Sequence, residues 1–297
     1  MQRVYHVCSL FCWKGDIMTV DIICPLYQAE MYIENLHKSL LNQKNVKINE
    51  IYYILTDSSD KSEELLKENH LNYRVIAKKD FSHSLVREQA ALNSKADIIC
   101  FISQDIVIES DNWLEELIKP IINEEASATY SRQLTKYNNI EKYTREYNYP
   151  NLDKIKSKID LPELGLKTFF FSDASSAIKR SVFVELNGYD GKNLPINEDM
   201  YFAYKLITND KKIKYCSKSV VYHSHKFSLN ELYSRYKLTG IFLKGNTYLD
   251  KYGTTSSGGN MAKYILKRII EEKRLGLLLR YPFDMAARLL GMKAGKR

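Results

Sequence analysis

The sequence predicts an α/β protein with a mostly parallel central sheet, helices on both faces and a helical C-terminal extension. From residue 18 onward, short apolar runs alternate with longer amphipathic segments, a pattern typical of parallel strands joined by helices. Beyond Ser228 the pattern is helical to the end. The chain has 297 residues, 44% of them hydrophobic, which suffices for one large domain and an appendage.

The alternation is clearest in the first half of the chain. The expected elements are strand 19–24, helix 29–41, strand 51–56, helix 62–69, strand 73–77, helix 84–94 and the fully apolar strand 98–102. In such sheets a ligand binds beyond the carboxyl ends of the strands. Polar residues that follow these strands are therefore the first candidates for a functional site.

The second half is less regular. We expect helix 112–122, a polar, Tyr-rich loop or irregular helix at 135–165, an aromatic-rich strand at 167–172, helices 181–186 and 198–208, and strand 219–223. The helices beyond residue 228 are interrupted at 253–259. This predicts a main domain at 18–227 and a basic helical extension at 228–297. Residues 1–17 form either a short segment packed on the surface or sequence upstream of a true start at Met18, and we favour the second.

The net charge of +8 is concentrated at one end. Residues 261–297 hold ten Lys or Arg against three acids, a net charge of +7, which leaves +1 for the rest. Nucleic-acid-binding proteins usually spread basic residues over the face that meets the phosphates, so we exclude nucleic acid and expect contact with an anionic membrane surface. The alternative is a helical pair that packs on the main domain with its basic side in water. No apolar run reaches the roughly 18 residues of a membrane-spanning helix.

Three polar groups follow or adjoin the predicted strands. Asp105 comes after strand 98–102, where a carboxylate can bind a divalent cation, although it can also cap a turn. Asp57 can accept hydrogen bonds from a nucleobase or ribose, whereas Asp60 or Ser59 can cap the next helix. Arg87 lies one helical turn beyond His83 and can bind a diphosphate, or it can simply face solvent.

Two further motifs occur near the end of the main domain. Asn197-Glu198-Asp199 opens a helix, where the helix dipole favours acids in any protein and also keeps a carboxylate ionised. Asp199 can therefore act as a general base. His223 and His225 share one face at strand spacing, and either can complete the shell of a cation held by Asp105. The five cysteines show no paired metal spacing and are expected to be buried free thiols.

These motifs together resemble a known family. Pro25-Leu26-Tyr27, Asp57, Gln104-Asp105, Glu198-Asp199 and the His223 segment occur in the order found in family 2 glycosyltransferases, and the resemblance covers residues 19–225. Within that family, five segments look most like bacterial rhamnosyltransferases that use dTDP-L-rhamnose: Phe81-Ser82-His83, Arg87, Ser103-Gln104-Asp105, residues 170–178 and His223-Ser224-His225. Many members carry Asp-x-Asp where this chain has Ser103-Gln104-Asp105, so metal affinity is expected to be modest.

The resemblance implies a GT-A (Rossmann-like) fold and a sugar transfer that inverts the anomeric carbon. It implies a divalent metal (Mg or Mn) on Asp105, His223 and His225, Asp199 as the catalytic base, and a lipid-linked saccharide acceptor at the inner face of the cytoplasmic membrane. Donor-site residues would be Pro25, Leu26, Tyr27, Glu30, Asp57, His83, Arg87, Gln104 and Asp105; acceptor-side residues would be Phe171, Asp173, Ser175 and Glu198. Alternatives are a UDP-hexose donor, or an inactive nucleotide-sugar-binding member of an assembly complex.

Overall fold

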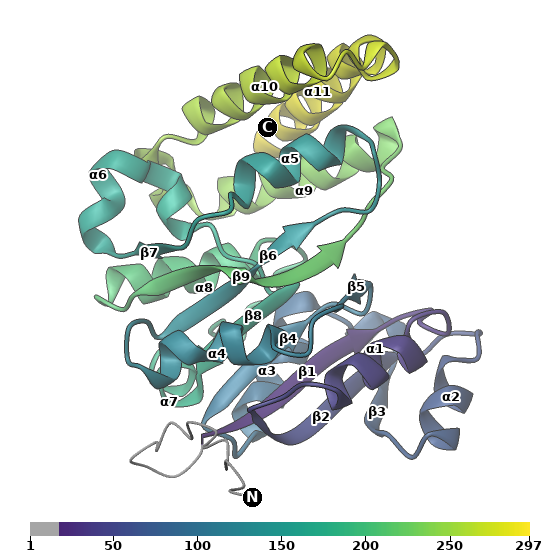
Figure 1. The fold of residues 1–297 in the computed structure, drawn as a ribbon. Coiled ribbons are helices and arrows are strands. Elements are labelled where there is room, and N and C mark those ends of the chain that lie inside the picture. The colour runs from purple at the N-terminus through teal and green to yellow at the C-terminus, as the bar shows by residue number, and fades with distance from the viewer. Residues whose placement is uncertain (1–17) are drawn as a thin grey trace, which may run out of the picture.

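The strands of the N-terminal half lie side by side in parallel, as predicted (Figure 1). The computed structural model describes residues 18–297, so the expectations for residues 1–17 lie outside the described residues. The elements are β1 (Thr19–Leu26), α1 (Ile33–Leu41), β2 (Lys47–Thr56), α2 (Ser62–Glu68), β3 (Asn72–Ile76), α3 (His83–Asn93) and β4 (Ile98–Ile102). Strands β3, β2, β1 and β4 pair in this order, all parallel.

The second half of the chain extends the same sheet with mixed pairing. It contributes β5 (Ile106–Val107), α4 (Trp113–Ile122), β6 (Ala128–Leu134), α5 (Ile140–Asn148), β7 (Lys154–Lys156), α6 (Leu161–Leu164), β8 (Ser175–Lys179), α7 (Arg180–Glu185), α8 (Glu198–Thr208) and β9 (Ile213–His223). Strand β8 is antiparallel to both β4 and β6, and β6 is parallel to β9. Strands β5 and β7 pair antiparallel with β9.

Successive residues of the central strands point to opposite faces and build two hydrophobic cores. Ile23 and Phe101 pack on one face with residues of α3, α7 and α8. Ile22 and Cys100 pack on the other face with residues of α1, α2 and α4. All five residues of β4 are buried, which explains its fully apolar sequence.

Two strand predictions for the second half are wrong. Residues 167–172 do not form a strand, because Gly165–Phe169 is a 3₁₀ helix whose Phe169 packs against the rings of Tyr204 and Tyr252. Strand β8 lies just beyond, and β6 was not predicted at all. The side chains of Thr129, Ser131 and Gln133 on β6 are fully buried and hydrogen-bonded. This central strand therefore has a polar sequence although it is buried.

Other boundaries also differ from the prediction. The stretch 135–165 contains the regular helix α5, and β9 begins six residues before the predicted start. The interruption expected at 253–259 is confined to Gly253, in the left-handed conformation with φ of 79°, since α10 (Thr254–Glu271) begins at the next residue. Helix α1 begins at Ile33 instead of residue 29, after a turn in which Gln28 has φ of 48°.

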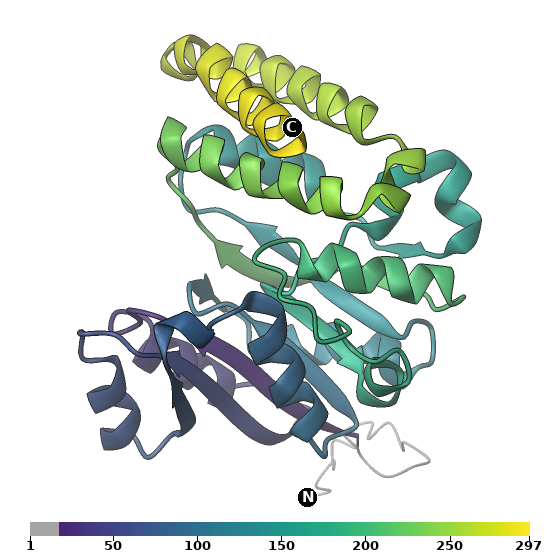
Figure 2. The same cartoon turned by 180° about the vertical axis from the view of Figure 1, so that it is seen from behind.

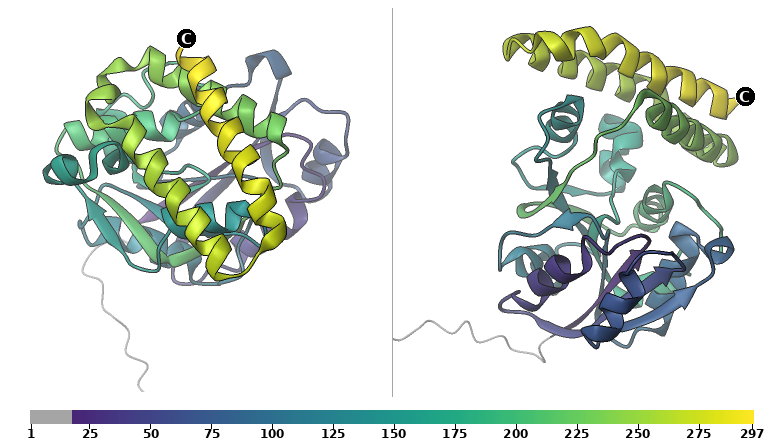
Figure 3. Two further views of the ribbon diagram at one scale, coloured as in Figure 1. Left: turned by 90° about the horizontal axis from the view of Figure 1, so that it is seen from above. Right: turned by 90° about the vertical axis from the view of Figure 1, so that its right-hand side faces the viewer.

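The C-terminal helices form a layer at the end of the molecule farthest from the N-terminal strands (Figures 1 and 2). They are α9 (Leu229–Gly245), α10 and α11 (Leu275–Lys296), with the 3₁₀ helix Thr247–Tyr252 between α9 and α10. Ser228 caps α9 by accepting a hydrogen bond from the Glu231 N–H. Seen from above, α10 and α11 lie across this end of the molecule (Figure 3). Among the described residues, no helix is long and apolar enough to span a membrane.

Helix α10 is attached to the main domain by α5. Ile265 and Ile269 of α10 pack on Ile140 and Tyr143 of α5. The Lys142 ammonium donates to Glu272 at 2.8 Å, and Arg268 pairs with Glu146 at 3.1 Å. Part of the basic segment is therefore neutralised by the domain on which it packs. The boundary between residues 227 and 228 stays a prediction.

Three of the cysteines, Cys24, Cys100 and Cys216, are buried free thiols, as expected. Burial raises the pKa of Cys216 to about 12, so this thiol stays protonated at neutral pH. Cys8 and Cys12 lie outside the described residues.

Candidate active site

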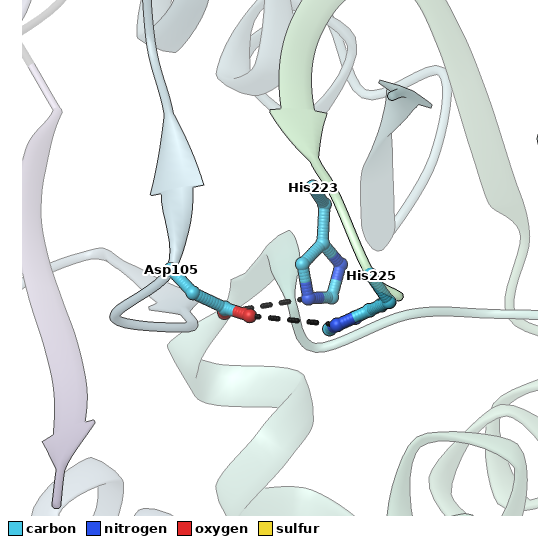
Figure 4. Close-up of side chains that lie close together, drawn as sticks. All are labelled: Asp105, His223 and His225. Atoms are coloured by element: carbon cyan, nitrogen blue, oxygen red, sulfur yellow. Dashed lines mark ion pairs between the residues drawn. The ribbon is translucent and has the colours of Figure 1, made fainter. Parts of the chain in front are cut away.

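Three potential metal ligands meet beyond the ends of β4 and β9. Asp105 follows β4, His223 is the last residue of β9, and His225 is two residues further on. Asp105 Oδ1 lies 3.3 Å from His223 Nε2, and Asp105 Oδ2 lies 3.9 Å from His225 Nδ1 (Figure 4). One ligand atom from each residue lies within 4.8 Å of the other two. The fold thus brings together residues more than a hundred positions apart in the sequence.

The orientation of His223 is fixed by Gln133, a residue of β6 that sequence reasoning missed. The Gln133 amide nitrogen donates to Ser172 Oγ at 2.8 Å, so its Oε1 faces His223 Nδ1 at 2.9 Å. Arg145 also donates to this oxygen, which leaves it an acceptor. His223 Nδ1 therefore carries the proton, and Nε2 presents its lone pair to Asp105.

A neutral imidazole and a carboxylate that face each other as two acceptors fit a cation between them. Burial lowers the pKa of His223 below its usual value. Burial and the nearby His223 lower the pKa of His225 to about 3. At neutral pH the set is one carboxylate and two neutral imidazoles. These donors suit a divalent cation with coordination positions left for diphosphate oxygens and water.

A second cluster lies where α3 approaches the start of α8. Arg87 Nη1 contacts Glu198 Oε1 at 3.3 Å, and both side chains are almost fully buried. Asp173 is also buried and accepts hydrogen bonds from Tyr189 at 2.6 Å and Ser176 at 2.7 Å. Arg87 is thus buried in an ion pair, and its expected contact with a diphosphate stays a prediction.

Asp199 belongs to the same cluster and is only partly buried at the surface of α8. Its Oδ1 accepts from the Met200 N–H at 2.7 Å. Burial, followed by the charges of Glu198 and Asp173, raises the pKa of Asp199 well above its usual range. Three carboxylates face one guanidinium here, so Asp199 is a stronger base than an ordinary aspartate.

Gln104 lies in Ser103-Gln104-Asp105, the segment where many family members carry Asp-x-Asp, and here its amide binds the backbone of Tyr27. Its Oε1 accepts from the Tyr27 N–H at 2.7 Å, and its Nε2 donates to the Tyr27 carbonyl at 2.9 Å. Both ends of the amide are thus used to hold the loop after β1 against β4. The Tyr27 hydroxyl in turn accepts from Lys78 Nζ at 3.0 Å. Gln104 positions Tyr27 and does not point its oxygen at the metal site.

The remaining donor-side candidates surround this loop. Asp57 is exposed after β2, and its backbone N–H donates to the carbonyl of Ile76. Glu30 accepts from the Lys61 N–H at 3.0 Å. Asp60 accepts from the hydroxyls of Ser58 and Ser62, whereas the N-cap of α2 is Lys61 and has no side-chain capping bond. His83 is exposed in the first turn of α3, whereas Leu26 is buried and Pro25 partly buried within β1.

Two of the expected acceptor-side residues lie in the core of the protein. Ser175 is fully buried, where its hydroxyl contacts Ser131 Oγ at 2.6 Å and the Trp113 Nε1 at 3.2 Å. Phe171 is buried with its ring 5.5 Å from that of Tyr130. Neither side chain presents a surface to a ligand, because both lie within the core between β6 and β8. Asp173 and Glu198 are likewise buried and act through the carboxylate cluster.

The fold and this site define the class of protein. Residues 21–186 match the model of the family "Glycosyl transferase family 2", more than half of the chain. The chain therefore belongs to glycosyltransferase family 2, it is a glycosyltransferase, and its fold is of the GT-A type.

More particular similarity is to two rhamnosyltransferases. The chain is 29% identical over 291 residues to an O-antigen chain rhamnosyltransferase of Salmonella typhimurium, with 94% of this chain and 90% of the relative covered. It is also 29% identical over 286 residues to an O-antigen chain rhamnosyltransferase of Salmonella anatum, covering 93% and 88%.

Solved structures share the fold. A mannosyltransferase from Pyrobaculum calidifontis, in complex with GDP-Man and Mn²⁺, superposes with a TM-score of 0.61 at 14% identity, with 94% of this chain and 87% of that chain covered. S. aureus TarS 1–349 in complex with UDP gives 0.54 at 14% identity, covering 94% and 90%.

Proposed function

We propose that this glycosyltransferase moves L-rhamnose from dTDP-L-rhamnose to a hydroxyl of a lipid-linked saccharide that becomes a surface polysaccharide. The observation that carries the proposal is the similarity, over more than nine-tenths of the chain, to two O-antigen chain rhamnosyltransferases. The residues of the candidate site supply each chemical role that such a transfer needs.

The leaving diphosphate needs a positive partner. Asp105, His223 and His225 would hold a divalent cation, Mg²⁺ or Mn²⁺, that supplies countercharge to the diphosphate. Gln133 keeps the lone pair of His223 directed at this site, and Gln104 holds the Tyr27 loop at the end of β1 where the nucleotide would lie.

The acceptor hydroxyl needs a base. Its oxygen attacks the anomeric carbon from the side opposite the diphosphate, Asp199 takes the proton, and dTDP leaves with the electron pair of the broken bond. This single displacement inverts the anomeric carbon. The neighbouring carboxylates Glu198 and Asp173 raise the pKa of Asp199 and so make it a stronger base. The positive charge of Arg87, which pairs with Glu198, offsets part of the negative charge of the three carboxylates.

We also propose that the enzyme works at the inner face of the cytoplasmic membrane, where a lipid-linked acceptor must be met. The segment of net charge +7 at residues 261–297 supports attraction to anionic lipids, which high salt would weaken.

A donor panel tests the proposal. The purified protein is incubated with Mn²⁺, a lipid-linked saccharide fraction and either dTDP-L-rhamnose, UDP-glucose or GDP-mannose, and both released nucleotide and labelled lipid are measured. We expect transfer from dTDP-L-rhamnose, and its loss in Asp199→Asn. If transfer occurs from UDP-glucose alone, the donor is a UDP-hexose and not dTDP-L-rhamnose. Binding of dTDP-L-rhamnose without any turnover would indicate an inactive nucleotide-sugar-binding protein.

A further inference from the structure

Helix α11 carries several large apolar side chains on the outside of the molecule. Leu275, Leu279 and Phe283 are 73%, 75% and 61% exposed, and Leu289 and Leu290 are 55% and 57% exposed. Their spacing places them on one face of the helix over more than four turns. A surface helix normally turns such a face to the core.

The inner side of α11 carries the apolar side chains Leu277, Tyr281 and Met285, which pack on the cluster formed by α5 and α10, and it also carries polar groups. Asp284 and Arg288 are buried there, and Arg288 pairs with Glu141 of α5. Asp284 accepts from Arg280 at 3.1 Å. Helix α11 therefore has an apolar inner side and, in addition, an outward apolar face that the protein leaves uncovered.

Close packing fixes this orientation. Gly291 and Gly295 of α11 lie against the backbone of α9, and a Cβ at Gly295 would collide with the Lys237 carbonyl oxygen. A Cβ on Gly240 of α9 would lie 2.5 Å from the Met292 carbonyl oxygen. Rotation of α11 to bury its leucines would bring larger side chains into these contacts and leave Arg288 unpaired. The outward apolar face is thus a stable feature of the fold.

Basic side chains surround that face. Lys293 lies on α11 in line with Leu275 and Leu279, while Lys263 on α10 and Lys273 between the two helices are exposed. Among the described residues these three lysines make no ion pair, in contrast to Arg268, Arg280 and Arg288, which pair with acids of α5, α10 and α11.

We propose that the outward face of α11, which we define as Leu275, Leu278, Leu279, Phe283, Leu289 and Leu290, inserts into the interface of an anionic lipid leaflet. An apolar stripe bordered by unpaired lysines matches acyl chains bordered by lipid phosphates. A second copy of the chain would bring the same lysines against these, so charge complementarity favours lipid over a dimer. This inference rests on the proposed function, because membrane binding would bring the enzyme to the surface that holds its lipid-linked acceptor.

Ile265 and Ile269 have a different role. They are fully buried against α5, so α10 attaches the layer to the main domain while α11 faces outward. The sequence left two roles open for the basic segment, packing on the main domain and contact with a membrane. In the structure α10 has the first role, and we assign the second to α11.

Vesicle binding tests this surface. Full-length protein is mixed with phosphatidylcholine vesicles containing about 30% phosphatidylglycerol, the anionic content to which polybasic segments respond, and bound protein is measured by flotation. We expect Leu279→Ser/Phe283→Ser to bind at least about tenfold more weakly, since each substitution removes a large buried apolar side chain from the bilayer. The matched control is Leu152→Ser/Ile159→Ser, because those residues are 73% and 90% exposed on a loop and a 3₁₀ helix away from α11.

The outcomes separate this inference from the proposed function. Equal binding by both double variants, or binding that is undiminished on pure phosphatidylcholine, would overturn the insertion of α11. A wild-type dimer in light scattering that becomes monomeric in Leu279→Ser/Phe283→Ser, with vesicle binding unchanged, would assign the face to a second copy. Binding of dTDP-L-rhamnose to the protein in solution is measured in parallel. If the protein binds vesicles but not dTDP-L-rhamnose, the proposed donor is wrong and the membrane-binding surface is retained.

Discussion

Arg87 provides the sharpest test of how the carboxylate cluster is built. It is buried beside Glu198, with Asp173 and Asp199 in the same cluster. Arg87→Met keeps most of the side-chain volume and removes the charge. Taking one partner from a buried ion pair costs about 3–5 kcal/mol, which for a protein of this size lowers Tm by roughly 6–20 °C near pH 8.

The loss should depend on pH in a defined direction. Burial raises the pKa of Asp173 to about 6 even with Arg87 present, and Arg87 is the group that opposes this rise most, ahead of the hydrogen bonds from Tyr189 and Ser176. Without it, the folded-state pKa values of the carboxylates move further above their unfolded values. The folded state then binds more protons, so stability returns as the pH falls through the raised pKa values and is lost as the pH rises. The Tm deficit should shrink from pH 8 to pH 5.5.

Thermal unfolding at the two pH values, with dTDP binding measured at each, is the assay. Arg74→Met is the control, because Arg74 on β3 donates to the neutral amide of Gln89 at 2.6 Å and its loss should not depend on pH. The reasoning is refuted if Arg87→Met keeps the wild-type Tm and loses dTDP binding, which would make Arg87 a diphosphate ligand. An equal deficit at both pH values would also refute it.

Four further outcomes are expected. Asp105→Asn should lower Mn²⁺ affinity in calorimetry and reduce turnover by at least about a hundredfold; unchanged turnover would remove Asp105 from the metal site. Gln133→Leu should weaken Mn²⁺ binding by about 10–100-fold and recover turnover at high Mn²⁺, whereas a loss that metal does not rescue would deny it a positioning role. Because the pKa of Asp199 is raised, activity should fall on acidification at a higher pH than an ordinary aspartate allows. In Asp199→Asn, transfer should drop by about a hundredfold or more with dTDP binding retained; a matching loss of binding would place Asp199 in the donor site.

The first half of the fold could be predicted because most buried positions of its strands are apolar. Strand β4 is an uninterrupted apolar run, and each crossover helix has a clear apolar stripe. Strands β6 and β8 could not be predicted from the sequence. Their buried positions carry Ser and Thr side chains, and serine hydroxyls hydrogen-bond to one another inside the sheet. A polar sequence that is buried by side-chain hydrogen bonds carries no periodic apolar signal.

The site shows the same division. Asp105, His223 and His225 follow strands with clear patterns, so their meeting at one sheet edge could be anticipated. Gln133 could not, because it lies on the unpredicted strand β6. The burial of Arg87 depends on where α8 approaches α3, a tertiary contact that helix spacing does not encode.

The account centres on a cation that is bound by two histidines and by the donor diphosphate at once. Pulsed electron paramagnetic resonance of the protein with equimolar Mn²⁺ and dTDP tests this most directly, because it detects nuclei bound to the metal. We predict modulation from histidine nitrogen together with coupling to phosphorus, and loss of the nitrogen signal in His223→Ala/His225→Ala. Phosphorus coupling without any nitrogen modulation in the wild-type protein would contradict the Asp105–His223–His225 site.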